Sequence, residues 1–398
     1  MTTHRSQTPI PSATDSRDPE CPAGAECTGA PAPGAQGGVA AVELDLYGDV
    51  ALLTAAIMDI DSVSGNETAL ADAVERALAA LPHLTVTRNG DSLVARTSLG
   101  RAERVILAGH LDTVPLPTVP GARGTVPSSW DGEVLYGRGA TDMKGGVAVQ
   151  LALAATLREP TKDMTFIFYD NEEVAAAKSG LGRLVRENCE LLDADFGILL
   201  EPTNGTVEGG CNGTIRFEAT TRGLAAHSAR AWMGENAIHA AAPILARLAA
   251  YKPATVSVEG LDYRESMNAV KIHGGTAGNV IPDQCVVEIN YRFAPDKTPT
   301  QAEAHVRELL DGFDLVCTDS SAGARPGLTA PAAATFVAAV GREPLPKYGW
   351  TDVARLSEMG IPAVNFGPGN ALLAHSDDEH VNAEDIRECL AALTRWLT

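Results

Sequence analysis

Six ionisable side chains of this sequence directly follow short apolar segments or lie in the loops after them. The apolar segments have the length and texture of central strands in a parallel sheet, whose two faces are both buried. In a sheet flanked by helices, ligands bind in the crevice beyond the carboxyl ends of the strands. These side chains are therefore expected to meet in one site: His110, Asp142, Glu172, Glu173, Glu201 and His375.

The order of the segments predicts the fold. Strand-like and helix-like segments alternate up to about residue 210, which is typical of an α/β domain, a mixed sheet with helices on both faces. From residue 214 the pattern changes to long alternating strands with two amphipathic helices, and after residue 321 the α/β pattern returns. We therefore predict a catalytic domain of residues 42–212 and 322–398, with an inserted α+β lid or dimerisation domain of residues 213–321.

The composition argues against some classes of partner and indicates the cellular compartment. A formal net charge of −20 argues against nucleic acid as a partner, and there is no apolar run long enough to predict a membrane span. The seven cysteines are scattered without CxxC pairs, which indicates reduced thiols and a cytoplasmic protein. Residues 1–41 are rich in Pro, Ala, Gly, Ser and Thr and are expected to form a disordered tail.

The donor atoms at the strand ends favour a metal site. Histidines and carboxylates without a cysteine suit one or two divalent ions such as Zn²⁺, Co²⁺ or Mn²⁺. Each residue also has an ordinary alternative: Asp142 could cap the next helix, Glu201 could be a turn residue, and His375 could be a surface histidine in an acidic loop. A single metal site explains all of these positions together.

Five motifs, in this order, resemble the M20 family of dinuclear zinc amidohydrolases and exopeptidases. They are HLDTVP (110–115), GRGATDMKGG (137–146), DNEE (170–173), EPT (201–203) and AHSDDEHV (374–381). The resemblance covers about residues 45–398, and the inserted module is similar to the family's lid or dimerisation domain. Longer stretches, among them LLEPTNGTVEGGCNGT and NVIPDQCVVEINYRFAP, resemble the branch that hydrolyses N-succinyl-LL-2,6-diaminopimelate in lysine biosynthesis.

The resemblance implies a role for each residue of the cluster. Asp142 would bridge two ions, Zn²⁺ in the first place and Co²⁺ as the alternative. His110 and Glu201 would complete the shell of one ion, and Glu173 and His375 that of the other. Asp112 would accept the second ring N–H of His110. Glu172 would be the general base that takes a proton from water and delivers it to the leaving amine.

The same resemblance implies a second subunit and a set of substrate contacts. His227 would reach the active site of the partner subunit and stabilise the oxyanion, which implies a homodimer formed through residues 213–321. The residues expected to contact the small N-acyl amino acid substrate are Arg292 and Asn279, with Thr351 and Asn370 as further candidates that could equally be cap or turn residues. The better-known form of the branch has an arginine near the place of Cys211, and Arg216 or Arg230 could replace it.

Other functions stay open from the sequence alone. The same chemistry could act on N-acetylornithine or on a C-terminal peptide bond. A non-catalytic scaffold that binds metal or peptide could keep the fold, but it would be expected to have lost a ligand or the base. All five expected ligands and Glu172 are present.

Overall fold

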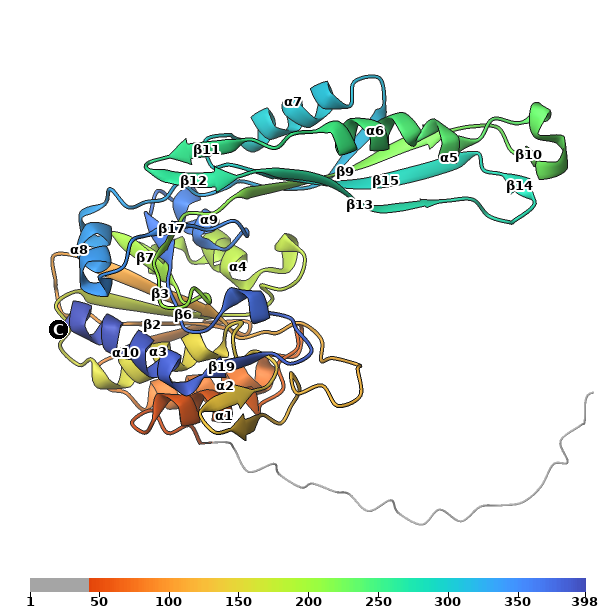
Figure 1. Ribbon diagram of the computed structural model, residues 1–398. Helices are drawn as coiled ribbons and strands as arrows, with labels where there is room; N and C mark the ends of the chain where they lie inside the picture. The colour runs from red at the N-terminus through yellow and green to blue at the C-terminus, as the bar shows by residue number, and fades with distance from the viewer. Residues whose placement is uncertain (1–42) are drawn as a thin grey trace, which may run out of the picture. The chain divides into compact units, whose positions relative to one another are not determined.

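An eight-stranded mixed sheet is the largest sheet of the computed structural model, which describes residues 43–398 (Figure 1). The predicted tail, residues 1–41, lies outside the described residues. Strand β3 lies near the middle of the sheet and is parallel to both of its neighbours, β6 and β7. The strands follow the order β1 (Thr85–Asn89), β2 (Ser92–Arg96), β6 (Asp163–Tyr169), β3 (Arg104–His110), β7 (Phe196–Leu199), β18 (Ala363–Asn365), β8 (Glu208–Gly209) and β17 (Leu345–Pro346).

Helices cover both faces of this sheet because its central strands are apolar on both sides. In β3, Val105 and Leu107 belong to one hydrophobic core, while Ile106 and Ala108 belong to another. The first core contains α1 (Val50–Met58), α2 (Thr68–Ala79), α3 (Lys144–Thr156), α8 (Pro331–Val340) and α10 (Ala383–Leu397). The second contains α4 (Gly180–Glu187) and α9 (Val353–Glu358). Such alternation follows from the two-residue period of a strand.

Helix α3 is buried nearly all round and packs closely against the sheet at Gly146. Every residue of α3 except Thr156 is buried. A Cβ atom at Gly146 would lie 2.2 Å from the carbonyl oxygen of Leu200, so only glycine permits this approach. The close packing sets the start of α3, and with it Asp142, beside the carboxyl end of β7.

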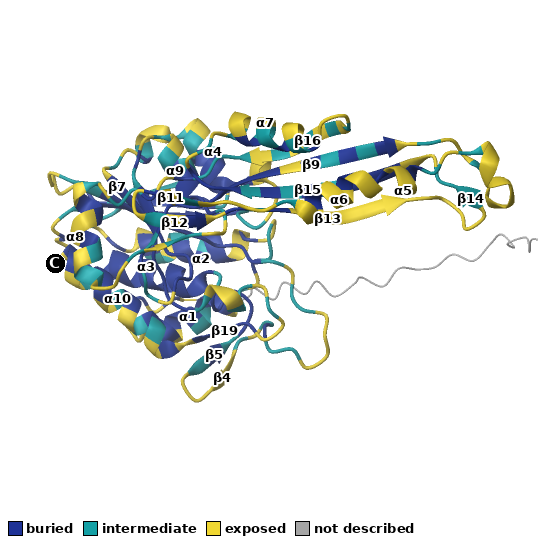
Figure 2. Ribbon diagram, turned by 45° about the horizontal axis from the view of Figure 1, so that its top comes forward, coloured by how far each residue is buried: buried dark blue, intermediate teal, exposed yellow. Residues whose placement is uncertain are grey.

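A second, four-stranded antiparallel sheet has a core of its own. Its order is β13 (Ser266–Gly274), β15 (Gln284–Phe293), β9 (Gly213–Arg222) and β16 (Asp314–Ser321). The helices α5 (Ala237–Ala240), α6 (Ala242–Ala250) and α7 (Pro299–Leu309) pack on one face, against residues such as Phe217 and Ile289. The opposite face carries no helix, and burial alternates along β9 and β15 accordingly (Figure 2).

The predicted fold class, an α/β domain with an inserted α+β domain, is confirmed. The predicted domain boundaries stay a prediction, since residues 42–398 form a single compact unit. Within residues 43–398 the structure has no helix that is both long and apolar enough to cross a membrane. The remaining elements are β4 (Ser129–Asp131), β5 (Val134–Tyr136), β19 (His380–Asn382), β10 (Ala226–His227), β14 (Val280–Ile281), β11 (Thr255–Val258), β12 (Leu261–Arg264) and four 3₁₀ turns, η1 (Ala176–Lys178), η2 (Cys189–Leu191), η3 (Ser228–Met233) and η4 (Ala371–Leu373).

Candidate metal centre

The carboxylate of Asp142 lies between two histidines. Its Oδ1 is 3.2 Å from Nε2 of His110, and its Oδ2 is 3.3 Å from Nε2 of His375. The same Nε2 atom of His375 is 2.8 Å from Oε1 of Glu173. Asp142 thus presents one oxygen to each histidine.

Neighbouring strands bring the other members of the cluster together. His110 is the last residue of β3, Glu173 follows β6, and Glu201 follows β7. These three strands are parallel neighbours, so their carboxyl ends meet at one edge of the sheet. Asp142 stands just before α3 but does not cap it: the N-cap residue is Met143, and it makes no side-chain cap hydrogen bond. The helix-cap alternative for Asp142 therefore fails.

Two loop residues at the site have unusual backbone conformations. His375 has φ of 62° and Asn171, next to Glu172, has φ of 59°. Residues other than glycine rarely occupy this left-handed region, which costs on the order of 1–3 kcal/mol where it is strained. The surrounding contacts hold both loops in place, and as a result the side chains of Glu173 and His375 meet.

The electrostatics of the cluster fit a divalent cation. Hydrogen bonds that His375 donates to the carboxylates of Asp142 and Glu173 raise its pKa to about 10. Burial, together with the charge of Asp142, raises the pKa of Glu201 to about 8. Both shifts reflect an excess of negative charge in a partly dry pocket, which a divalent ion would neutralise.

The ligand atoms of the cluster also fit a divalent cation. One ligand atom each from His110, Asp142 and Glu173 lies within 4.8 Å of the others, and the donors are nitrogen and oxygen only. Burial opposes protonation of His110, but the hydrogen bond to Asp142 and the charge of Asp112 hold its pKa well above the ordinary value. The cluster would therefore exchange protons for metal when ions bind.

Asp112 holds the site through contacts that differ from the predicted one. The ring Nδ1 of His110 lies 2.9 Å from the main-chain carbonyl oxygen of Asp112, whereas the Asp112 carboxylate is farther away, at 3.6 Å. That carboxylate instead accepts the main-chain N–H groups of Glu172 and Glu173, at 2.9 and 3.0 Å, and the hydroxyl of Ser64. Asp112 therefore orients His110 by its backbone and the Glu172–Glu173 turn by its side chain.

Glu172 and Glu173 line the same cavity, which has a volume of about 680 Å³. This volume is in the range of small-molecule sites. Burial and the charges of Asp352 and Glu201 raise the pKa of Glu172 well above its ordinary value, although the charge of His110 opposes the shift. A carboxylate with a raised pKa is suited to take up and return a proton near neutral pH.

The structure adds residues that the sequence reasoning missed. Glu379 is fully buried, accepts the main-chain N–H groups of Thr141 and Asp142 at 3.1 Å each, and pairs with Arg138 at 2.6 Å. It therefore fixes the backbone at Asp142. Glu379 lies within the quoted motif AHSDDEHV, but nothing in the sequence distinguishes it from the aspartates beside it. Asp352, buried on the cavity wall, was missed in the same way.

His227 and Asn279 lie together, but not at the cluster. His227 pairs with Val280 between β10 and β14, its Nδ1 accepts the N–H of Ala229, and the carbonyl of Asn279 accepts the N–H of Ser228. Figure 1 places β10 and β14 at one end of the four-stranded sheet and β12 at the other. It is β12 that contacts the larger sheet, through a 2.6 Å hydrogen bond from Tyr263 to the Gly209 carbonyl.

The other predicted substrate contacts divide into one in the cavity and two outside it. Arg292 lines the cavity beside Glu172. The hydroxyl of Thr351 is buried and donates to Oδ1 of Asn365 at 2.8 Å, so it is already engaged. Asn370 caps η4 by accepting the N–H of Leu372. The structure therefore agrees with the alternative role of Asn370 as a cap residue.

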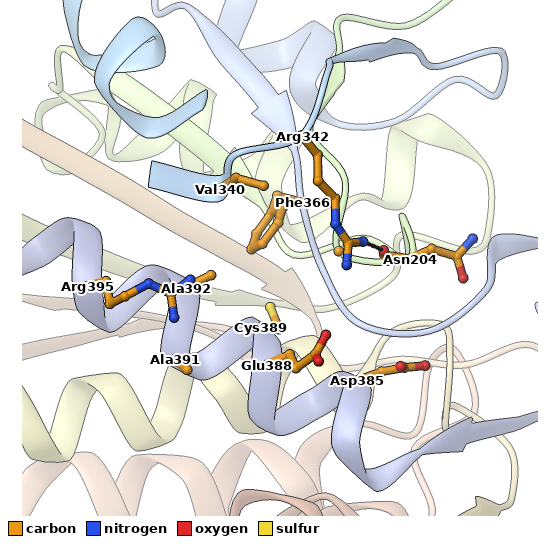
Figure 3. Close-up of a pocket in the computed structure, with 11 residues that line it drawn as sticks. Asn204, Val340, Arg342, Phe366, Asp385, Glu388, Cys389, Ala391, Ala392 and Arg395 are labelled. Carbon is orange, nitrogen blue, oxygen red and sulfur yellow. Dashed lines mark hydrogen bonds between the residues drawn. The ribbon is translucent and has the colours of Figure 1, made fainter. Parts of the chain in front are cut away.

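A separate cavity of about 290 Å³ lies beside α10 (Figure 3). Figure 3 shows Arg342 on its wall, donating to the carbonyl of Asn204, with Cys389 and Glu388 opposite. None of the five clustered donors lines this cavity. The chemistry suggested by the cluster therefore belongs to the larger cavity next to Glu172.

The fold and the metal-ligand cluster define a protein class, and comparison with known proteins identifies it: the chain belongs to peptidase family M20/M25/M40, whose signature matches residues 106–398. The relatives include "Putative succinyl-diaminopimelate desuccinylase DapE" of Mycobacterium tuberculosis, 50% identical over 357 residues that cover 89% of this chain and 99% of the relative. Succinyl-diaminopimelate desuccinylase of Corynebacterium glutamicum is 44% identical over 366 residues, covering 89% and 98%.

Solved structures agree on the fold. A tripeptidase from Staphylococcus aureus has a TM-score of 0.71 at 22% identity, covering 89% of this chain and 98% of its own. An M20 family metallo-carboxypeptidase from Sulfolobus solfataricus has a TM-score of 0.70 at 16% identity, covering 88% and 98%. The prediction of an M20 family amidohydrolase that depends on metal is confirmed.

Proposed function

We propose that this protein hydrolyses the amide bond of N-succinyl-LL-2,6-diaminopimelate to succinate and LL-2,6-diaminopimelate, in lysine and diaminopimelate biosynthesis. The observation that carries the proposal is the Asp142 carboxylate, shared between His110 and His375 beside Glu172, in a chain 50% identical to a relative with that name. The near-complete coverage of both chains supports transfer of the whole activity rather than of one domain.

Two divalent ions would be held around Asp142, with Zn²⁺ as the favoured metal and Co²⁺ as the alternative. His110 and Glu201 would bind one ion, and Glu173 and His375 the other, with Asp142 shared. When bound, such ions polarise a carbonyl oxygen and lower the pKa of water to about 7. The all-nitrogen-and-oxygen donor set supports this choice of metals.

Glu172 would be the general base that transfers a proton from water to the leaving amine. Its side chain lines the cavity next to Glu173, and its raised pKa suits a group that takes a proton from the attacking water and passes it to the leaving amine. Its main-chain N–H is held by Asp112, which fixes where the turn presents the carboxylate. A small shift of that turn would misplace the base and lower turnover.

The active unit would be a cytoplasmic homodimer formed through residues 213–321. His227 and Asn279 lie together away from the cluster of their own chain, which supports a role in a partner's site, where His227 would stabilise the oxyanion. Nearby Trp232 is 81% exposed and Met233 60%, and β13 is an edge strand with Val270 exposed. Apolar surface and an unpaired strand edge favour association. The five described cysteines are free thiols, which suits the cytoplasm.

Side-by-side kinetics on the metal-reconstituted protein test the substrate. We expect kcat/KM for N-succinyl-LL-2,6-diaminopimelate to exceed that for N-acetylornithine and for dipeptides by at least about 100-fold, since a site built for several carboxylates leaves its charges unpaired with shorter substrates. A preference for N-acetylornithine or a dipeptide would replace the proposed substrate.

The Glu172→Gln variant tests the catalytic role against a non-catalytic scaffold. It should lower kcat by about 10²–10⁴-fold while the bound metal, measured by atomic emission, stays at the wild-type value. Glu187→Gln, on the exposed end of α4, is the matched control and should leave kcat unchanged. Unchanged turnover in Glu172→Gln would remove this residue from the mechanism.

A further inference from the structure

Part of the wall of the 680 Å³ cavity that Glu172 and Glu173 also line comes from the face of the four-stranded sheet that carries no helix. Arg216 on β9, Arg292 on β15 and Asp319 on β16 all line it. Arg216 pairs in register with Asn290 on β15 and with Asp319 on β16. Charged residues of both signs therefore stand on adjacent strands where the sheet lines the cavity.

A β-bulge turns Asp319 into the cavity. The register of β16 against β9 shifts between Cys317 and Asp319. Cys317 pairs with Phe217 and packs against the helix-covered core, and in a regular strand Asp319, two residues later, would face the same core. The bulge pairs Asp319 with Arg216 instead, on the opposite face. Bulges often re-aim a side chain next to an active site.

The Arg216–Asp319 pair is loose and its polar atoms are free. Nε of Arg216 is 3.9 Å from Oδ2 of Asp319, beyond hydrogen-bond distance. Among residues 43–398 the structure records no hydrogen bond of the Arg216 guanidinium or the Asp319 carboxylate. By contrast, Lys271 and Glu288 on the same sheet are 2.7 Å apart. A separated pair with unused donors and acceptors can take a ligand that carries both charges.

A second cation stands beside the pair. Arg292 donates to Oδ1 of Asn290 at 3.1 Å, and no carboxylate within residues 43–398 forms an ion pair with it. Burial and the positive charge of Arg216 lower the pKa of Arg292. Two guanidinium groups held near each other, with one loosely paired carboxylate beside them, leave a net positive charge that favours a bound carboxylate. The four-stranded sheet thus brings Arg216, Arg292 and Asp319 to the cavity, while Glu288, which also lines it, is already paired with Lys271.

We propose that Arg216 and Asp319 bind the free amino-acid end of the substrate, with Arg216 on its carboxylate and Asp319 on its ammonium group. This inference rests on the proposed function, because the substrate carries its single free ammonium at the end remote from the succinyl amide. The succinyl end has only a carboxylate, and Asp319 would repel it. A pair of opposite charges matches the α-amino acid end alone.

Two variants and two substrate analogues test the assignment in the metal-loaded protein. Arg216→Met should lower kcat/KM for N-succinyl-diaminopimelate at least about tenfold, chiefly through KM, since the contact is remote from the scissile bond. The loss should fall below about threefold with lysine succinylated on its α-amine, which lacks the remote carboxylate. Asp319→Asn should also lower kcat/KM for N-succinyl-diaminopimelate at least about tenfold. This loss should fall below about threefold with N-succinyl-2-aminopimelate, which lacks the remote ammonium.

The chain supplies a matched control. Arg222 and Asp314 lie on the same two strands, also 3.9 Å apart, but neither lines the cavity. Arg222→Met should leave kcat/KM for every substrate unchanged. Equal losses in Arg222→Met and Arg216→Met, or a loss in Arg216→Met that is the same with all substrates, would overturn the assignment.

Binding of the product separates this inference from the proposed function. Titration calorimetry of LL-2,6-diaminopimelate into the metal-loaded protein should show affinity lowered at least about tenfold in Arg216→Met and Asp319→Asn, but not in Arg222→Met. If the wild type fails to hydrolyse the succinyl substrate, the proposed function falls, and the titration still decides the inference. Equal affinity in the wild type and the two cavity variants, or no binding to the wild type, would overturn it.

Discussion

Nε2 of His375 lies 2.8 Å from Oε1 of Glu173, although 202 residues separate them in the chain. The contact joins the loop after β18 to the loop after β6, which are not neighbours in the sheet. Nε2 of His375 also lies near Oδ2 of Asp142, and a carboxylate oxygen of Glu173 lies near ligand atoms of Asp142 and His110. This contact closes the cluster on its exposed side, and it is the basis of the first prediction.

Replacing His375 by alanine should remove one ion and leave the other. We expect the affinity for one of two Zn²⁺ ions to fall by more than about 100-fold, because even an outer partner of a metal ligand is worth 10–100-fold. Atomic emission after dialysis against a weak chelator measures the stoichiometry. His239→Ala, an exposed histidine on α5, is the control. Two ions retained at wild-type affinity would contradict the proposed ligand role.

Metal binding should release protons near neutral pH. In the metal-free protein the pKa of His375 is about 10 and that of Glu201 about 8, so both groups carry a proton at pH 7. Ions bind the deprotonated forms, so apparent affinity should rise with pH and level off above pH 10. Calorimetry in buffers of different ionisation enthalpy should give at least about two protons released per protein at pH 7, with a further contribution from His110, whose pKa is also raised. A heat that does not depend on the buffer would contradict these pKa shifts.

Two inactive variants should restore activity when mixed if His227 serves the partner's site. His227→Ala lacks the oxyanion donor, and Glu172→Gln lacks the base, so a mixed dimer has one site with both residues. Activity after co-refolding should reach about a quarter of wild type, because half of the random dimers are mixed and each has one complete site. Mixing Glu172→Gln with Glu173→Gln, which both damage their own site, is the control. No recovery would show that His227 acts within its own chain or not at all.

Asp163 should stabilise the fold in a pH-dependent way. Its carboxylate accepts hydrogen bonds from Thr97 Oγ1, Leu99 N and Arg101 N, at 2.7, 2.8 and 2.9 Å. Burial opposes these bonds, but their sum lowers the pKa of Asp163 below its ordinary value of 3.8. Its contribution is therefore fully present above that pH and is lost as the pH falls through the lower value of the folded state.

Urea unfolding of Asp163→Ala measures this contribution. At pH 7 the variant should be about 2–4 kcal/mol less stable than the wild type, since the buried Thr97 hydroxyl and two part-buried main-chain N–H groups lose their acceptor. The difference should shrink as the pH is lowered below 3.8. The exposed Asp311→Ala variant is the control and should change stability by less than about 0.5 kcal/mol. A difference that stays constant with pH would contradict the role of the charge.

The sequence by itself identified the strand ends and the kind of chemistry there. Apolar runs such as residues 105–109 predict buried strands because they lack polar residues on either face, and the polar residue that ends each run, here His110, predicts the edge where the strands meet. The motifs that resemble the M20 family predicted which residues along the chain are the metal ligands. The prediction of an inserted α+β domain likewise followed from strand texture alone.

Only the tertiary structure decided which contacts at the site are made by side chains and which by the main chain. Asp112 was expected to hold His110 through its carboxylate, yet its carbonyl does so while the carboxylate holds the next turn. The bulge that turns Asp319 toward Arg216 is likewise absent from the alternation of the sequence. Hydrogen-bond direction and strand register depend on which backbones lie side by side. Residue types and local periodicity fix the elements and their polarity, but contacts between distant segments exist only once the chain is packed.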